Sequence, residues 1–204
     1  SDNVDGMARQ GDYKKALDLL ASARKRHGLS EWTQPIDRKI DDLKKAESGD
    51  AAVQQAADAD NLVCVEAERF HAKADIGKHA WTLVTTPPGF QGSGAMAALP
   101  NVGFGFPTGF ATTSPRMDYR IRFHKAGKHY LWIRGYAETP NDDSVHAGLD
   151  NAEVPSSSTI ALYANKKWSW TNKTSSGTPA SIEIPSSGLH TVNLWMREDG
   201  AIVD

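Results

Sequence analysis

Two glutamates, Glu66 and Glu68, stand two positions apart in an otherwise apolar stretch and could bind a cation. In a β-strand, residues two apart face the same side, so both carboxylates would leave one face of a sheet. Like charges side by side are unfavourable unless a positive group lies between them. Calcium suits such a pair because it takes a shell of hard oxygen ligands that typically includes carboxylates. The alternative interpretation is a solvated acidic strand edge without a metal ion.

A second set of residues could bind a ligand that offers both hydroxyl groups and an apolar C–H face. Flat aromatic rings beside planar amides and carboxylates complement those two surfaces. Residues of these types in or beside the expected loops are Trp168, Trp170, Asn172, Tyr136, Asn141, Asp142 and Asp143. We predict that this set contacts a ligand.

Each member of this set also has a structural interpretation. One of the two neighbouring tryptophans could belong to a core, and the acidic pair of the turn could do no more than close it. Trp132 and Trp195 lie in the middle of expected strands, so we predict that they pack inside. The sequence leaves open whether the site lies at the loop end of the sheets or on a sheet face where Trp132, Arg134 and Tyr136 line up.

Composition and motifs exclude several functions. The 23 basic and 25 acidic residues leave a formal charge of −2, which removes the electrostatic footprint of a nucleic-acid binder. No apolar run is long enough for a membrane span. The single cysteine rules out a disulfide framework and a cysteine-built zinc site. Nucleophile-elbow, Walker, dinucleotide-binding and HExxH patterns are missing, so we expect no enzyme activity.

The elements that must position these residues fall into two unlike parts. Residues 1–60 hold two of the seventeen aromatic residues and repeat apolar residues at helical spacing. This pattern predicts one helix that ends at His27 before Gly28, a second over residues 35–46 and a third, short helix over 51–57. We interpret residues 1–60 as an α-helical hairpin that serves as a spacer.

Residues 61–204 alternate apolar and polar residues with period two between turn-forming segments. Strands are expected over residues 62–68, 81–84, 95–99, 117–123, 129–137, 144–149, 159–162, 167–171, 181–184 and 190–196. Short strands at this spacing, without helical periods between them, predict a mostly β, antiparallel β-sandwich. The last residues read as the middle of a strand, so we expect the chain to be part of a longer protein.

Five segments of this second part come in a characteristic order. They are Val65-Glu66-Ala67-Glu68, Gly92-Ser93-Gly94-Ala95-Met96, Ala126-Gly127-Lys128-His129-Tyr130-Leu131-Trp132-Ile133-Arg134, Gly188-Leu189-His190-Thr191-Val192 and Asp199-Gly200-Ala201-Ile202-Val203-Asp204. Over residues 62–204 this order resembles that of the galactose-binding-like β-sandwich carbohydrate-binding modules, families 6 and 35 in particular. The insert at residues 101–114, rich in Gly and Phe, departs from the pattern, and the strand expected after Asp204 is missing.

The resemblance implies a jelly-roll sandwich with a structural calcium ion held by Glu66, Glu68 and Asp204. It also implies a non-catalytic module, secreted or at the cell surface, that binds a polysaccharide or oligosaccharide and targets a larger multidomain enzyme to it. The alternative is a structural or protein-interaction module, in which the helical part docks a partner and the sandwich is a spacer.

Overall fold

The computed structural model describes residues 4, 7, 13–27, 36–41, 44, 52–56, 61–163 and 165–204. The chain divides into two compact units, Ser1–Ala51 and Ala52–Asp204. This division lies upstream of the boundary between 1–60 and 61–204 that the sequence suggested. The reason is β1 (Val53–Gln54), which pairs in parallel with Ile121 and Arg122 of the second unit.

In the first unit, α2 (Tyr13–His27) coincides with the first predicted helix. Ala16 is fully buried, and Leu17, Leu19 and Leu20 pack beside it as one apolar stripe. Residues 36–41 are also helical, within the second predicted helix. The connection between the two, residues 28–35, lies outside the described residues. No helix in the described part of the chain has the length and apolar character to cross a membrane.

The second unit is built of short strands. After β1, its first half contains η1 (Ala67–Arg69), β2 (Ala72–Ala74), β3 (Ala80–Val84), β4 (Ala95–Leu99), α4 (Phe110–Thr113), β5 (Arg116–Phe123), β6 (Gly127–Tyr130) and β7 (Ile133–Tyr136). Its second half contains β8 (Ser144–Leu149), β9 (Ala152–Glu153), η2 (Pro155–Ser157), β10 (Ile160–Ala161), β11 (Ser169–Thr171), β12 (Ser181–Ile184), β13 (Gly188–Met196) and β14 (Ile202–Val203).

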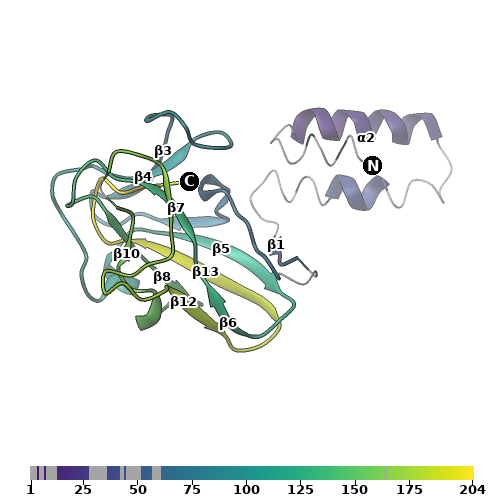
Figure 1. The fold of residues 1–204 in the computed structure, drawn as a ribbon. Coiled ribbons are helices and arrows are strands. Elements are labelled where there is room, and N and C mark those ends of the chain that lie inside the picture. Colours follow the sequence, from purple (N-terminus) through teal and green to yellow (C-terminus); the bar gives the residue numbers. More distant parts are fainter. Residues whose placement is uncertain are drawn as a thin grey trace. The chain divides into compact units, whose positions relative to one another are not determined.

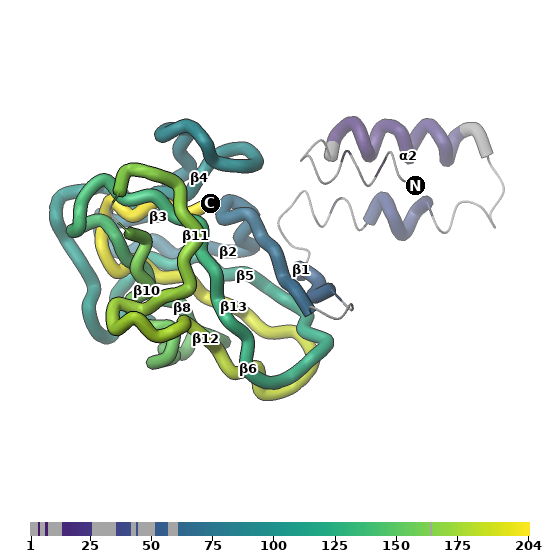
Figure 2. Tube along the Cα trace, in the orientation of Figure 1, coloured from purple at the N-terminus to yellow at the C-terminus, as the bar shows by residue number. Residues whose placement is uncertain are grey.

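These strands form two main layers, as Figures 1 and 2 show. Within the described residues, one sheet has the order β1-β5-β13-β8-β10, with β2 beside β5 and β9 beside β8. The other has the order β11-β7-β14-β4-β3, and β12 pairs with β6 in a small third sheet. All neighbours are antiparallel except β1 and β5. The predicted mostly β, antiparallel sandwich is confirmed.

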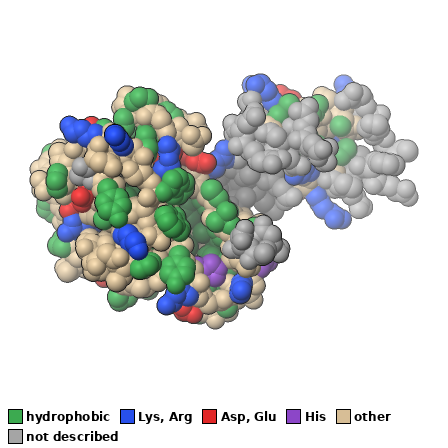
Figure 3. Space-filling view, viewed as in Figure 1, with side chains coloured by type: hydrophobic (Ala, Val, Ile, Leu, Met, Phe, Trp, Pro, Cys, Tyr) green, Lys and Arg blue, Asp and Glu red, His purple; other side chains and the backbone are tan. Residues whose placement is uncertain are grey.

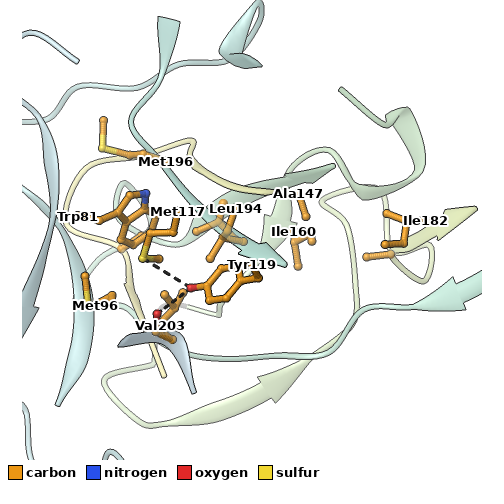
Figure 4. Packing of buried hydrophobic residues seen from close by; sticks show 14 of the residues in the cluster. Trp81, Met96, Met117, Tyr119, Ala147, Ile160, Ile182, Leu194, Met196 and Val203 are labelled. Carbon is orange, nitrogen blue, oxygen red and sulfur yellow. Dashed lines mark hydrogen bonds between the residues drawn. The ribbon is translucent and has the colours of Figure 1, made fainter. Parts of the chain in front are cut away.

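The core lies between the layers, because alternate residues of each strand point inward. On β5, Tyr119, Ile121 and Phe123 are buried, whereas Arg122 between them is exposed. Trp81 of the opposite sheet is also buried (Figure 4). The hydroxyl of Tyr119 donates to the carbonyl of Ala67 at 2.8 Å, which anchors η1 to this core.

Four local predictions have clear outcomes. Trp195 is fully buried, as predicted, but Trp132 is 59% exposed, so its predicted packing role is wrong. Residues 62–68 form no strand; Glu66 instead precedes η1. Residues 53–54 are a strand rather than a helix, because their backbone pairs with β5. At residues 53–54, tertiary pairing overrides local propensity.

Candidate functional site

Glu66, Glu68 and Asp204, the three predicted metal ligands, lie near one another. Glu66 precedes η1, Glu68 lies within it, and Asp204 follows β14. Burial, and then the charges of Asp204 and Glu68, raise the pKa of the Glu66 carboxyl above its ordinary value, while Arg134 lowers it. The fold thus brings Glu66 and Glu68, from the first of the five segments, close to Asp204, from the last. We call these three residues the carboxylate cluster. The two glutamates were predicted to share one face of a strand, but they are positioned by η1 and the residue before it.

The loop between β3 and β4 holds two of these carboxylates with its backbone. Gln91 N–H donates to the carboxylate oxygens of Asp204 at 3.0 and 3.1 Å. Ser93 donates to Oε1 of Glu68 from its N–H, at 2.9 Å, and from its hydroxyl, at 3.1 Å. Gly92 has φ +66°, and a Cβ there would lie 2.3 Å from Oε1 of Glu68. A side chain at this position would displace the Glu68 carboxylate and would be strained by the positive φ, which glycine adopts without strain.

The carboxylate cluster has the donor chemistry of a calcium site. Oε2 of Glu68 is buried and has no hydrogen-bond partner among the described residues. Such an oxygen is costly unless a donor or a cation satisfies it, and hard oxygen ligands suit calcium. The implied ion therefore fits this donor set. Nevertheless, no group of three or more His, Cys, Asp or Glu in the described part of the chain is already arranged to hold a metal. Protein hydrogen bonds occupy part of the cluster.

Three exposed aromatic side chains, which we call the aromatic row, lie on the outer side of the smaller sheets. Tyr130, Trp132 and Trp170 are 60%, 59% and 57% exposed. Leu131 and Ile133 pack against the core, so the residues that alternate with them point outward. Figure 3 shows hydrophobic side chains following one another over the face that carries β7 and β6.

Trp168 and Tyr136 are placed differently, because both pack against protein. Indole Nε1 of Trp168 donates to the carbonyl of Pro88 at 3.0 Å, and the two rings are 5.7 Å apart. The Arg134 guanidinium lies 5.0 Å from the Trp168 ring centroid. Arg134 also pairs with Asp204 and donates to the carbonyl of Gly89 at 2.6 Å. Arg134 therefore connects the carboxylate cluster with Trp168.

Asn172 lies beside the aromatic row, whereas the predicted turn residues do not. Asn172 follows β11 and is half-buried, and its main-chain carbonyl accepts from Ala180 N–H at 2.6 Å. Asn141, Asp142 and Asp143 lie in the turn after β7, at the opposite end of that strand from Trp132.

The turn uses part of its polar chemistry internally. Asp142 is buried and accepts from the Thr139 hydroxyl at 2.8 Å and the Asn101 amide at 3.2 Å. Burial is the main cause that raises the pKa of the Asp143 carboxyl; the nearby Asp142 adds to it and Arg197 opposes it. Asn141 is exposed.

One comparison decides the family. The model of the glycosyl hydrolase family 115 C-terminal domain matches residues 57–204, which is most of the chain. The chain belongs to this family. Its matched region starts close to the second compact unit and contains every residue of the carboxylate cluster and the aromatic row.

Relatives of this family 115 C-terminal domain are distant. A curated protein of Formosa agariphila, uncharacterized protein P23, is 30% identical over 92 residues, which are 41% of this chain and 22% of that protein. The chain thus spans about a fifth of that relative's length.

The chain is also similar to two solved structures. A Podospora anserina GH26-CBM35 β-(1,4)-mannanase is 17% identical, with a TM-score of 0.42 over 65% of this chain and 26% of that one. The C-terminal CBM6 of the Zobellia galactanivorans laminarinase LamC is 13% identical, with a TM-score of 0.41 over 69% and 92%. These two proteins contain modules of families 35 and 6, the families that the sequence resembles.

Sequence reasoning on this family 115 domain missed Tyr130 as a site candidate. It expected Trp132 to pack inside, and it named Trp132 only in the alternative site on a sheet face. The segment Tyr130-Leu131-Trp132-Ile133-Arg134 is apolar or aromatic at four of its five positions, which is typical of a strand buried on both faces. The usable signal is that the two aliphatic residues alternate with the three large ones. Such alternation places the aromatic rings together on one face.

Proposed function

We propose that this family 115 C-terminal domain is a non-catalytic module that binds carbohydrate and holds a larger polysaccharide-active protein at its glycan. One observation carries the proposal: Trp132, which directly precedes β7, and Trp170 on β11 are both more than half exposed, and Asn172 follows β11 beside them. Exposed rings on a rigid sheet offer the apolar platform that the C–H face of a sugar requires, and an amide can bind its hydroxyl groups. Such glycans lie outside cells, so we place the protein there.

We assign different tasks to the predicted ligand residues. Trp170 and Asn172 contact the sugar directly. Trp168 and Tyr136 lie on the same face but support it structurally, because their contacts with Pro88 and with each other fix the start of β11. The exposed amide of Asn141 and the carboxylate of Asp143 are further candidate contacts at the loop end, and Asp142 keeps their turn closed.

We also propose that Glu66, Glu68 and Asp204 hold a structural calcium ion. The orphaned Oε2 of Glu68 and the raised pKa of Glu66 support this assignment. A bound ion would neutralise the mutual repulsion of the cluster and fasten η1 to the end of β14, a structural and not a catalytic task.

Affinity gel electrophoresis on xylan, β-1,4-mannan and laminarin tests the binding function. We expect retardation on at least one polysaccharide, and loss of it in Trp170→Ala. Leu189→Ala is the matched control, because Leu189 is also exposed but lies on β13 of the other sheet. Absence of retardation on every polysaccharide would contradict the proposal.

A second function, docking of a protein partner by the helical unit, is favoured by one observation. A hollow in this unit is lined by the apolar Leu17, Ala21 and Ile40, with Arg24 and Lys44 at its rim. If this hollow binds the preceding part of a family 115 enzyme, Ile40→Asp abolishes their co-sedimentation. Glycan binding by the unchanged chain, with no co-sedimentation, excludes the docking function.

A further inference from the structure

The aromatic row forms a line rather than a pocket. Tyr130 and Trp132 are two residues apart on one extended segment, so their attachment points are about 7 Å apart. Trp170 pairs in register with Arg134, which places it diagonally across from Trp132 at about 7–8 Å. Three rings therefore follow one another over a span of about 14 Å.

We propose that the aromatic row binds an internal stretch of a linear polysaccharide, with consecutive sugar rings on Trp170, Trp132 and Tyr130. This inference rests on the proposed carbohydrate-binding function and names the class of substrate for the same face. The ligand must be an extended chain, because the three rings lie in a line. Three successive sugars can contact them only if the glycan runs along that line.

Exposure separates this mode from recognition of a chain end. A site for a terminal sugar encloses that sugar, and its aromatic walls lose most of their own solvent contact. In contrast, each ring of the aromatic row keeps more than half of its surface in solvent. Each ring is therefore open along the direction of the row, which lets a chain enter and leave.

A polar group accompanies the row at its centre. Asn172 continues β11 beyond Thr171, the residue that pairs with Ile133, so it lies next to Trp132. Its main-chain carbonyl is used by Ala180 N–H, but among the described residues its side-chain amide has no hydrogen bond. The amide can thus bind a ring hydroxyl and fix the register of the chain.

Calorimetry with an oligosaccharide series from one to six units, cut from the polysaccharide that retards the chain most, tests the inference. We expect the affinity to rise by roughly three- to ten-fold per added ring until the row is filled, then to level off. Tyr130→Ala should reduce the affinity for the hexasaccharide to that for a shorter oligomer and reduce disaccharide binding much less, because a disaccharide can still bind to Trp170 and Trp132. Leu189→Ala should change neither. Unchanged thermal melting verifies that both variants fold.

Four outcomes overturn the inference. Equal affinity for disaccharide and hexasaccharide, or no effect of Tyr130→Ala, would assign a short site and leave the carbohydrate-binding function standing. Failure of every oligosaccharide and polysaccharide to bind would remove that function as well. Light scattering is the third measurement: if the chain is a dimer that Trp132→Ala converts to a monomer, the aromatic row is an interface between two copies.

Discussion

At the scale of single residues, His146 shows how the sandwich fixes a protonation state. The side chain is fully buried and stacks on Phe110, with ring centroids 3.8 Å apart. Nδ1 accepts from the backbone N–H of Thr159 at 2.9 Å, so the proton resides on Nε2, which donates to the carbonyl of Phe106 at 3.0 Å. Burial, the largest cause, lowers the pKa of His146 from 6.5 to about 4, against the backbone hydrogen bond that raises it.

The depressed pKa of His146 predicts a loss of stability in acid. Below pH 6.5 the unfolded chain takes up a proton at this position, but the folded chain does so only near pH 4. The free energy of unfolding should therefore fall between pH 6.5 and pH 4, by an amount on the order of 3 kcal/mol from this residue. Urea unfolding at several pH values measures it. His146→Gln should lose that part of the slope, and an identical slope in both proteins would contradict the assignment.

At the scale of elements, alternation along the sequence predicts the strands well. The expected strands at 95–99, 144–149 and 181–184 coincide with β4, β8 and β12. The expected strand at 129–137 is divided into β6 and β7, because β6 pairs with β12 and β7 with β11 and β14. Such a change of partner depends on distant segments, so the local pattern does not contain it.

The candidate site is predicted less completely than the strands, for the same reason. The nearness of Glu68 and Asp204 follows from family resemblance, but the hydrogen bonds that the N–H groups of Gln91 and Ser93 donate to them do not. Gln91 N–H meets Asp204 across 113 positions of sequence. Trp168 and Trp170 are the same residue type, two positions apart on one strand face. Pro88 and Arg134 nevertheless cover Trp168 and leave Trp170 exposed. Only non-local packing separates a supporting ring from an exposed one.

The η1 segment, the loop before β4 and the end of β14 should respond together to calcium. If the carboxylate cluster binds the ion, calcium stabilises the folded chain by about 2.7 kcal/mol at a concentration of 100 Kd, because the unfolded chain has no such cluster. Thermal melting after chelation, with and without added Ca²⁺, measures the shift.

Glu68→Gln should remove the calcium response, because Glu68 contributes the orphaned oxygen. Glu183→Gln, at an exposed position on β12, is the matched control and should keep it. Equal melting temperatures with chelator and with calcium would exclude the ion.

At the scale of the whole molecule, the boundary between the units depends on one short segment. β1 pairs with β5, and the side chain of Gln55, which follows it, is buried. Its Oε1 accepts from the N–H groups of His124 and Lys125 at 2.7 and 3.1 Å. Its amide donates to the carbonyl of Asn61 at 2.7 Å. Residues 53–55 therefore belong physically to the sandwich.

Two fragments test this boundary. A fragment that starts at residue 61 loses β1 and the hydrogen bonds of Gln55, so it should be less stable than one that starts at residue 52 by roughly 3 kcal/mol. For a unit of this size, such a loss lowers the melting temperature by about 10 °C. Gln55→Ala in the longer fragment keeps the β1 backbone and should fall between the two. Gln55 accepts hydrogen bonds from the turn after β5, so its loss should be measurable. Equal melting temperatures of the two fragments would mean that the sandwich begins at residue 61.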